Sequence, residues 1–83
     1  MEQAKKSVDA LHQTLQETAV PAPRQESIDD ITTHIERFQE DPAAHHLTLR
    51  ERLEAALTEF DADHHTVSEA LRLAIYDLSN AGV

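Results

Sequence analysis

Cysteine and tryptophan are absent from this 83-residue chain, and glycine occurs only once. Without thiols the chain can form neither disulfides nor cysteine-ligated zinc sites. The single glycine is Gly82, so the sequence has no glycine-rich loop to cradle a phosphate and no nucleophile elbow. Proline is confined to positions 21, 23 and 42. With so few residues that interrupt regular structure, we expect long helices.

Basic residues are also scarce. The chain has seven lysines and arginines and sixteen acidic residues, which gives a formal charge of −9. This charge would be repelled by nucleic-acid phosphates and by anionic lipid, so we expect neither as a partner. No apolar run approaches the roughly 18 residues that span a bilayer. The first six residues, Met-Glu-Gln-Ala-Lys-Lys, lack the apolar core of a signal peptide, so a cytoplasmic location is expected.

The apolar residues recur every three or four positions, which is the period of an amphipathic helix. This period predicts one domain over residues 1–83 with helices over 2–19, 24–40, 49–61 and 66–81. The fold class is therefore all-α. The short connections favour two antiparallel hairpins, in which the first helix pairs with the second and the third with the fourth. The hairpins would form a helical bundle or a dimeric assembly that resembles a coiled coil.

Several helix ends can be read from capping residues. Pro21 and Pro23 end the first helix, and Pro23 suits the first turn of the next one. Asp41-Pro42 looks like an N-cap residue followed by a first-turn proline. Residues 42–47 could therefore be either a helical turn or a loop. The Thr48–Glu51 segment fits a capping box and predicts the start of the third helix. The fourth helix could be capped by Asp63, His64 or Thr66, and Gly82 would end it.

The fourth helix has more apolar surface than one neighbour can cover. Leu73 and Tyr76 lie roughly 160–240° around the helix from Val67, outside its main stripe. Either this helix is central in the fold, or the second surface meets another chain. Since chains of this size have marginal cores, we expect a homodimer, with a monomeric four-helix bundle as the alternative. The predicted contact residues are Leu73, Tyr76, Leu71, Ile75 and Leu78.

Histidine is the obvious candidate for ligand chemistry, because six occur in the chain and four form two doublets. Imidazole binds zinc, copper and nickel. Neighbouring residues on a helix point about 100° apart, however, so a doublet is a poor clamp for one metal. We expect the doublets to be solvent-facing cap and loop residues and expect no cofactor. They are the low-ranked metal candidates His45, His46, His64 and His65.

Paired carboxylates are the other possible source of chemistry. They occur at Asp29/Asp30, Glu40/Asp41 and Asp61/Asp63. General acid–base catalysis needs two carboxylates with separated pKa values in a pocket that excludes water. These pairs fall at predicted helix starts or exposed connections, where capping accounts for them. We therefore expect that the protein is not an enzyme.

The C-terminal third resembles a known family. Phe60-Asp61-Ala62-x-His64, then Leu71-Arg72, Ile75 and Leu78-Ser79-Asn80-x-Gly82-Val83, resemble the end of small prokaryotic proteins known as domain of unknown function four-four-zero-four. Members typically read Phe-Glu-x-x-His-Pro, a helix, and Leu-x-Asn-x-Gly-Ile. His65 stands where the family usually has proline. The resemblance implies no activity, cofactor or catalytic residue.

Two functional hypotheses follow from the sequence. The first is a non-enzymatic, self-associating helical interaction module whose contact surface is on the fourth helix. The alternative is a metal- or ligand-responsive accessory protein that uses the histidine doublets.

Overall fold

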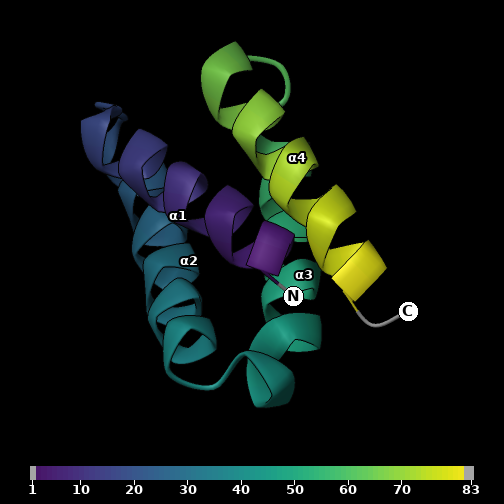
Figure 1. Ribbon diagram of the computed structural model, residues 1–83. Helices are drawn as coiled ribbons and strands as arrows, with labels where there is room; N and C mark the ends of the chain where they lie inside the picture. Colours follow the sequence, from purple (N-terminus) through teal and green to yellow (C-terminus); the bar gives the residue numbers. More distant parts are fainter. Residues whose placement is uncertain (1, 82–83) are drawn as a thin grey trace.

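The computed structural model describes residues 2–81 and contains four helices in that range (Figure 1). They are α1 (Glu2–Glu17), α2 (Ala22–Glu40), α3 (Pro42–Phe60) and α4 (His65–Ala81). The described residues contain no strand. The prediction of an all-α, four-helix bundle is therefore confirmed. The helix stop expected at Gly82 lies outside the described residues.

The third helix begins seven residues earlier than predicted. It starts at Pro42, and the Asp41 side chain accepts a hydrogen bond from the Ala44 backbone N–H at 3.3 Å. A capping carboxylate followed by a first-turn proline is a complete helix start. The predicted start at the Thr48 capping box is wrong, since Thr48 lies inside α3. Residues 42–47 are helical.

The other boundaries lie closer to the prediction. Helix α1 ends at Glu17, and Pro21 is extended before α2, with φ −60° and ψ 154°. Pro23 lies in the first turn of α2, as predicted. Among the three candidates for the start of α4, the structure selects His64, whose carbonyl accepts from the Ser68 N–H at 2.9 Å. The capping box at Thr66 is therefore not the helix start.

The pairing of the helices differs in one respect from the predicted hairpins. The α3–α4 hairpin forms as expected, but α1 packs mainly against α4, and α2 packs mainly against α3. Contact between α1 and α2 is the smallest of the four interfaces. In Figure 1, α1 diverges from α2 with distance from their connection and runs towards α4. The expectation that the first helix pairs mainly with the second is thus wrong.

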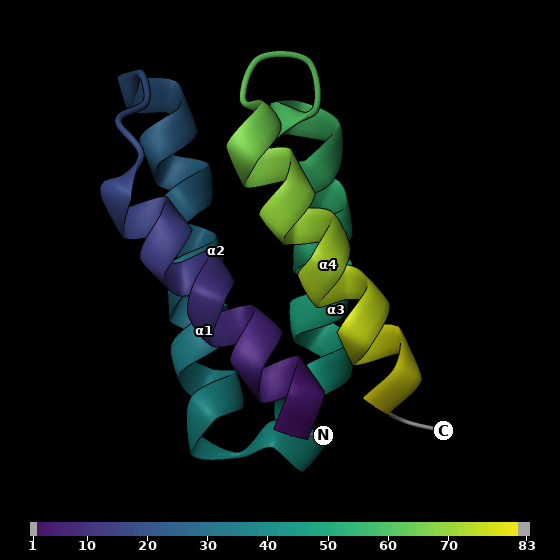
Figure 2. The same cartoon turned by 45° about the horizontal axis from the view of Figure 1, so that its top comes forward.

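The connections account for this pairing. Only Asp41 separates α2 from α3, so these helices are held together at that end, whereas the non-helical residues 18–21 let α1 diverge from α2. Figure 2 shows α4 in front, alongside both α1 and α3. Helix α4 therefore has neighbours on two sides, α1 and α3, just as α3 has α2 and α4.

The core lies between all four helices, and each contributes four buried apolar residues at the predicted spacing. Partly buried Leu57 and Ile75 pack against it. One chain thus encloses a continuous apolar interior. The core residues are Ala4, Val8, Leu11, Leu15, Ile28, Ile31, Ile35, Phe38, Leu49, Leu53, Ala56, Phe60, Val67, Leu71, Ala74 and Leu78.

Candidate interaction surface on α4

The five predicted contact residues of α4 separate into three environments. Leu71 and Leu78 are 0% and 1% exposed and belong to the core, so they are unavailable to a partner at the surface of this fold. Their assignment to the contact surface is therefore wrong for this fold, because both belong to the buried stripe of α4 that packs into the shared core. Ile75 is partly buried against the core. Leu73 and Tyr76 are 53% and 66% exposed.

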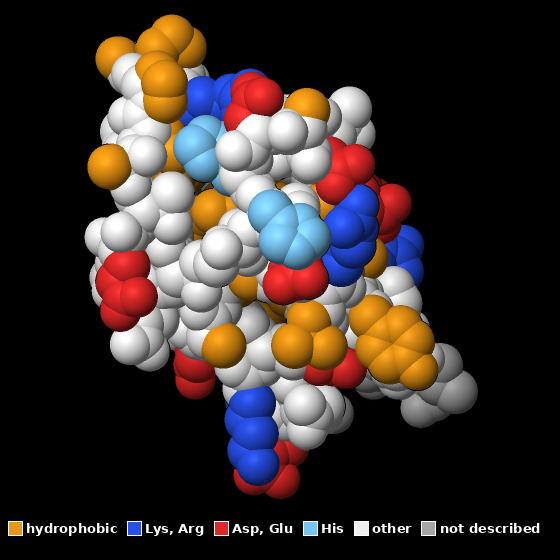
Figure 3. All heavy atoms as spheres, turned by 90° about the horizontal axis from the view of Figure 1, so that it is seen from above, with side chains coloured by type: hydrophobic (Ala, Val, Ile, Leu, Met, Phe, Trp, Pro, Cys, Tyr) orange, Lys and Arg blue, Asp and Glu red, His pale blue; other side chains and the backbone are white. Residues whose placement is uncertain are grey.

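Leu73 and Tyr76 form the exposed apolar part of α4, which we call the outer face together with Glu69 and Arg72. Residues three and four apart on a helix are neighbours on its surface. The flanks of α4 are covered, since α4 packs against α1, where Asp77 accepts a hydrogen bond from Ser7, and against α3. In Figure 3 the apolar side chains on the visible face lie in small separate groups among charged ones.

The outer face of α4 is nearly neutral in a chain that is strongly acidic. Helix α4 contains Glu69, Arg72 and Asp77 as its charged residues, and Asp77 is buried. Helix α2, by contrast, carries five acidic and two basic residues. The connections add Asp41, Asp61 and Asp63. A second acidic molecule would therefore meet less electrostatic repulsion at α4 than at α2.

The two charges on the outer face already have partners within the chain. Glu69 Oε1 lies 3.1 Å from His65 Nε2, and Arg72 pairs with Asp61. All four side chains are at least half exposed, so these pairs contribute little to stability. They can be rearranged at small cost when another molecule approaches.

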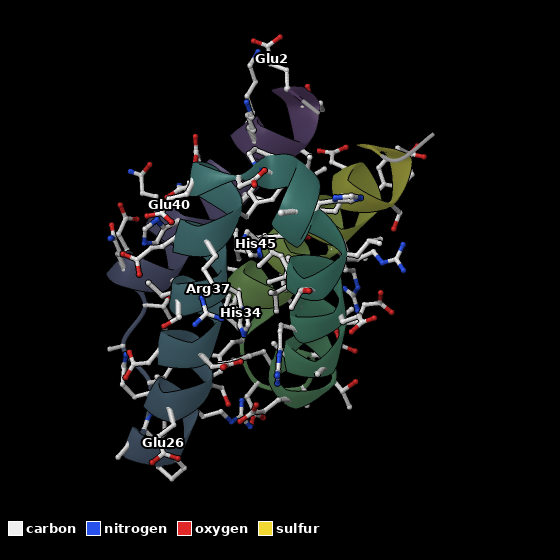
Figure 4. All side chains as sticks on the ribbon, turned by 90° about the horizontal axis from the view of Figure 1, so that it is seen from below. Glu2, Glu26, His34, Arg37, Glu40 and His45 are labelled. Carbon is white, nitrogen blue, oxygen red and sulfur yellow. The ribbon has the colours of Figure 1, made fainter. Side chains whose placement is uncertain are left out.

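The histidine doublets lie at opposite ends of α3 and are not brought together. His64 packs its ring against the edge of Phe60, with centroids 5.6 Å apart, while His65 is exposed. His46 Nδ1 lies 3.2 Å from the carbonyl of Pro42, and His45, labelled in Figure 4, is partly buried. Within residues 2–81, no three histidines or carboxylates are placed to hold a metal ion.

The paired carboxylates are all exposed. Asp61 pairs with Arg72, and Asp63 Oδ2 accepts from Arg24 Nη2 at 2.8 Å. Figure 4 shows Glu2, Glu26 and Glu40 at the periphery of the molecule, pointing away from it. Exposure, with or without an ion pair, is the ordinary surrounding of surface carboxylates.

Two open hollows lie between helices. One of about 280 Å³ separates α2 from α3, where Ser27 Oγ donates to Glu59 Oε2 at 2.7 Å and Arg52 faces Asp30 at 4.0 Å. The other, of about 460 Å³, lies between the end of α1 and the start of α4 and includes His64 and His65. In the first hollow, the hydrogen bond between Ser27 and Glu59 therefore joins α2 directly to α3.

Two polar contacts were not foreseen from the sequence. Ser7 and Asp77 are 5% and 9% exposed and are hydrogen bonded to each other between α1 and α4. Arg24 lies over the Phe60 ring, 5.1 Å from its centroid, and joins α2 to the end of α3. Each of Ser7 and Asp77 immediately precedes a core residue, so helical position alone could have marked them as flanking the core. Their pairing depends on which helices are neighbours.

The comparisons with known proteins identify a family but no activity. None of the helices in residues 2–81 is long and apolar enough to cross a membrane. No curated protein and no solved structure matches the sequence. The family model described as Domain of unknown function (DUF4404) matches residues 4–83. Because this match extends far beyond the C-terminal third, over nearly the whole chain, the protein belongs to the DUF4404 family.

Proposed function

We propose that this protein is a non-enzymatic helical interaction module that associates with a second copy of itself through the outer face of α4. The observation that carries the proposal is the exposure of Leu73 and Tyr76 on a helix whose flanks are already covered by α1 and α3. Leu73 and Tyr76 are three positions apart and therefore neighbours on the helix surface, and contiguous exposed apolar surface marks interaction sites. Tyrosine is also enriched in the centre of protein interfaces.

A second copy is the occupant that the charge distribution favours. The chain carries −9, yet the exposed charges of α4 are one glutamate and one arginine. Two copies that meet at α4 keep their acidic α2 helices away from the contact. Repulsion between like charges is thereby reduced, and Leu73 and Tyr76 of both copies are removed from water.

The proposed association is weak and depends on concentration. A helix of 17 residues is about 25 Å long, and one face of it offers less than the roughly 800 Å² per partner of a standard interface. Full burial of each large apolar side chain contributes roughly 1.5–3 kcal/mol. Part of that gain is offset by the lost freedom of the two molecules. We therefore expect a reversible dimer.

The test compares solution mass by light scattering over a range of protein concentrations for three proteins. The wild type is expected to increase in mass towards the dimer, and Leu73→Glu/Tyr76→Glu is expected to stay monomeric at the concentrations at which the wild type begins to dimerise. Leu47→Glu is the matched control, since Leu47 on α3 is 54% exposed and Leu73 is 53% exposed. It should associate as the wild type does. A wild-type protein that is monomeric at every concentration, or a double variant that dimerises at the same concentrations as the wild type, would show the proposal to be wrong.

A further inference from the structure

We propose that α1 is an exchangeable arm, which leaves its place on α4 and is replaced by α1 of a second copy. The inference starts from how α1 is held. Its contact with α2, the next helix in the chain, is the smallest interface in the bundle, and its main contact is with α4 at the other end of the sequence. The exchange is independent of the outer face of α4.

The docking of α1 on α4 is specific and self-contained. The stripe of Ala4, Val8, Leu11 and Leu15 is buried in the core, and Ser7 donates a hydrogen bond to the buried Asp77, 70 positions away. On the side of α2, an exposed hydrogen bond joins Gln39 to Asp9 at 2.8 Å. An incoming α1 from another molecule would restore all of these contacts.

Exchange therefore requires no new complementary surface. Domain swapping is a low-cost route to dimers because the swapped state reuses contacts that the monomer already makes. Helix α1 has to be released from α4 but keeps little attachment to α2. Higher protein concentration then favours the exchanged dimer by mass action.

The connection before α2 has the features of a hinge. Residues 18–21 are non-helical, and the segment ends in Pro21 with extended backbone, followed by Pro23 in the first turn of α2. Proline restricts the backbone of such a connection and limits how it can fold back. Short hinge loops favour swapping, and this one already directs α1 away from α2.

The absence of cysteine from the chain makes a disulfide test clean. We would mix a tagged Ser7→Cys protein with an untagged Asp77→Cys protein, incubate the mixture at high concentration, and oxidise it. Both positions are buried in the closed monomer, at 5% and 9% exposure, so a disulfide between the two chains requires α1 of one to reach α4 of the other. Circular dichroism verifies that each variant retains its helices.

Exchange predicts a covalent heterodimer by intact mass and non-reducing gel, in a yield that rises with concentration and incubation time. A mixture of Gln13→Cys and Ser79→Cys proteins gives the background yield of disulfides between chains that form without exchange, since both of these side chains are exposed. A Ser7/Asp77 yield at or below this background would overturn the proposal. Inserting a few glycine and serine residues after Ala19 should lower the yield, because a longer loop eases closure within one chain.

A final arm of the experiment distinguishes this inference from the proposed function. The heterodimer should persist in the Leu73→Glu/Tyr76→Glu background, because α1 exchange does not use those side chains. Loss of the heterodimer in that background would refute exchange and leave contact at the outer face as the source of association. A persistent heterodimer combined with monomeric Leu73→Glu/Tyr76→Glu at low concentration would support both proposals.

Discussion

The sharpest stability prediction concerns the buried pair that joins α1 to α4. Ser7→Ala removes the hydroxyl that donates to Asp77 and leaves that carboxyl without this donor in a site that is 9% exposed. Leaving a buried polar group unsatisfied costs about 2 kcal/mol in the free energy of unfolding. For a domain of this size, that loss lowers Tm by about 10 °C.

The assay is urea and thermal unfolding followed by circular dichroism, with Ser79→Ala as the matched control. Ser79 is an exposed α4 residue, so its replacement reports the small gain in helix propensity that Ser→Ala brings without any lost contact. The difference between the two variants isolates the contribution of the buried hydrogen bond. Equal stability of Ser7→Ala and Ser79→Ala would refute the reasoning, since Asp77 would then be satisfied by another group or by water.

A double variant extends the same test. Ser7→Ala/Asp77→Leu removes both polar partners, and replacing both by apolar groups of similar shape is nearly neutral or stabilising. We expect the double variant to be more stable than Ser7→Ala alone, with a clear coupling energy in the double-mutant cycle. A double variant less stable than the single one would instead indicate that overpacking or a wider polar network dominates at this site.

The remaining predictions concern the two ends of α3. Asp41→Ala should lower the free energy of unfolding by about 1 kcal/mol, because it removes the N-cap of α3, whereas Thr48→Ala inside the helix should change it by less than about 0.5 kcal/mol. Urea denaturation measures the free energy of unfolding of both variants. A larger loss for Thr48→Ala than for Asp41→Ala would place the helix start at Thr48. Arg24→Ala should cost about 1 kcal/mol by losing the contact with the Phe60 ring. Arg24→Lys should recover only part of the stability that Arg24→Ala loses, as measured by thermal unfolding. Full recovery would mean that the planar guanidinium is unimportant.

Local signals predicted most of the secondary structure correctly. The apolar spacing found all four helices, and the buried stripe of α1 consists of the predicted Ala4, Val8, Leu11 and Leu15. The main miss was the start of α3, where two valid start signals compete. The Asp41-Pro42 cap comes first along the chain and begins the helix, so the Thr48 box has no free N–H groups left to cap.

The candidate surface was predicted only in part. Their angular distance from the main stripe of the helix correctly identified Leu73 and Tyr76 as residues outside the core. The same pattern could not separate Leu71 and Leu78 from a contact surface, because an apolar stripe has the same spacing whether it packs within a chain or between chains. Only the positions of α1 and α3 on either side of α4 decide this.

The order of residues by itself determined the helical class, the helix faces and the acidic surface, since these depend on period, propensity and charge along a single chain. The tertiary structure decided which helices are neighbours. It placed α1 on α4 instead of α2 and thereby brought Ser7 and Asp77 together across 70 positions. Such pairing depends on the angles at three short connections and on how four apolar stripes fill one shared interior, and no local pattern encodes that fit.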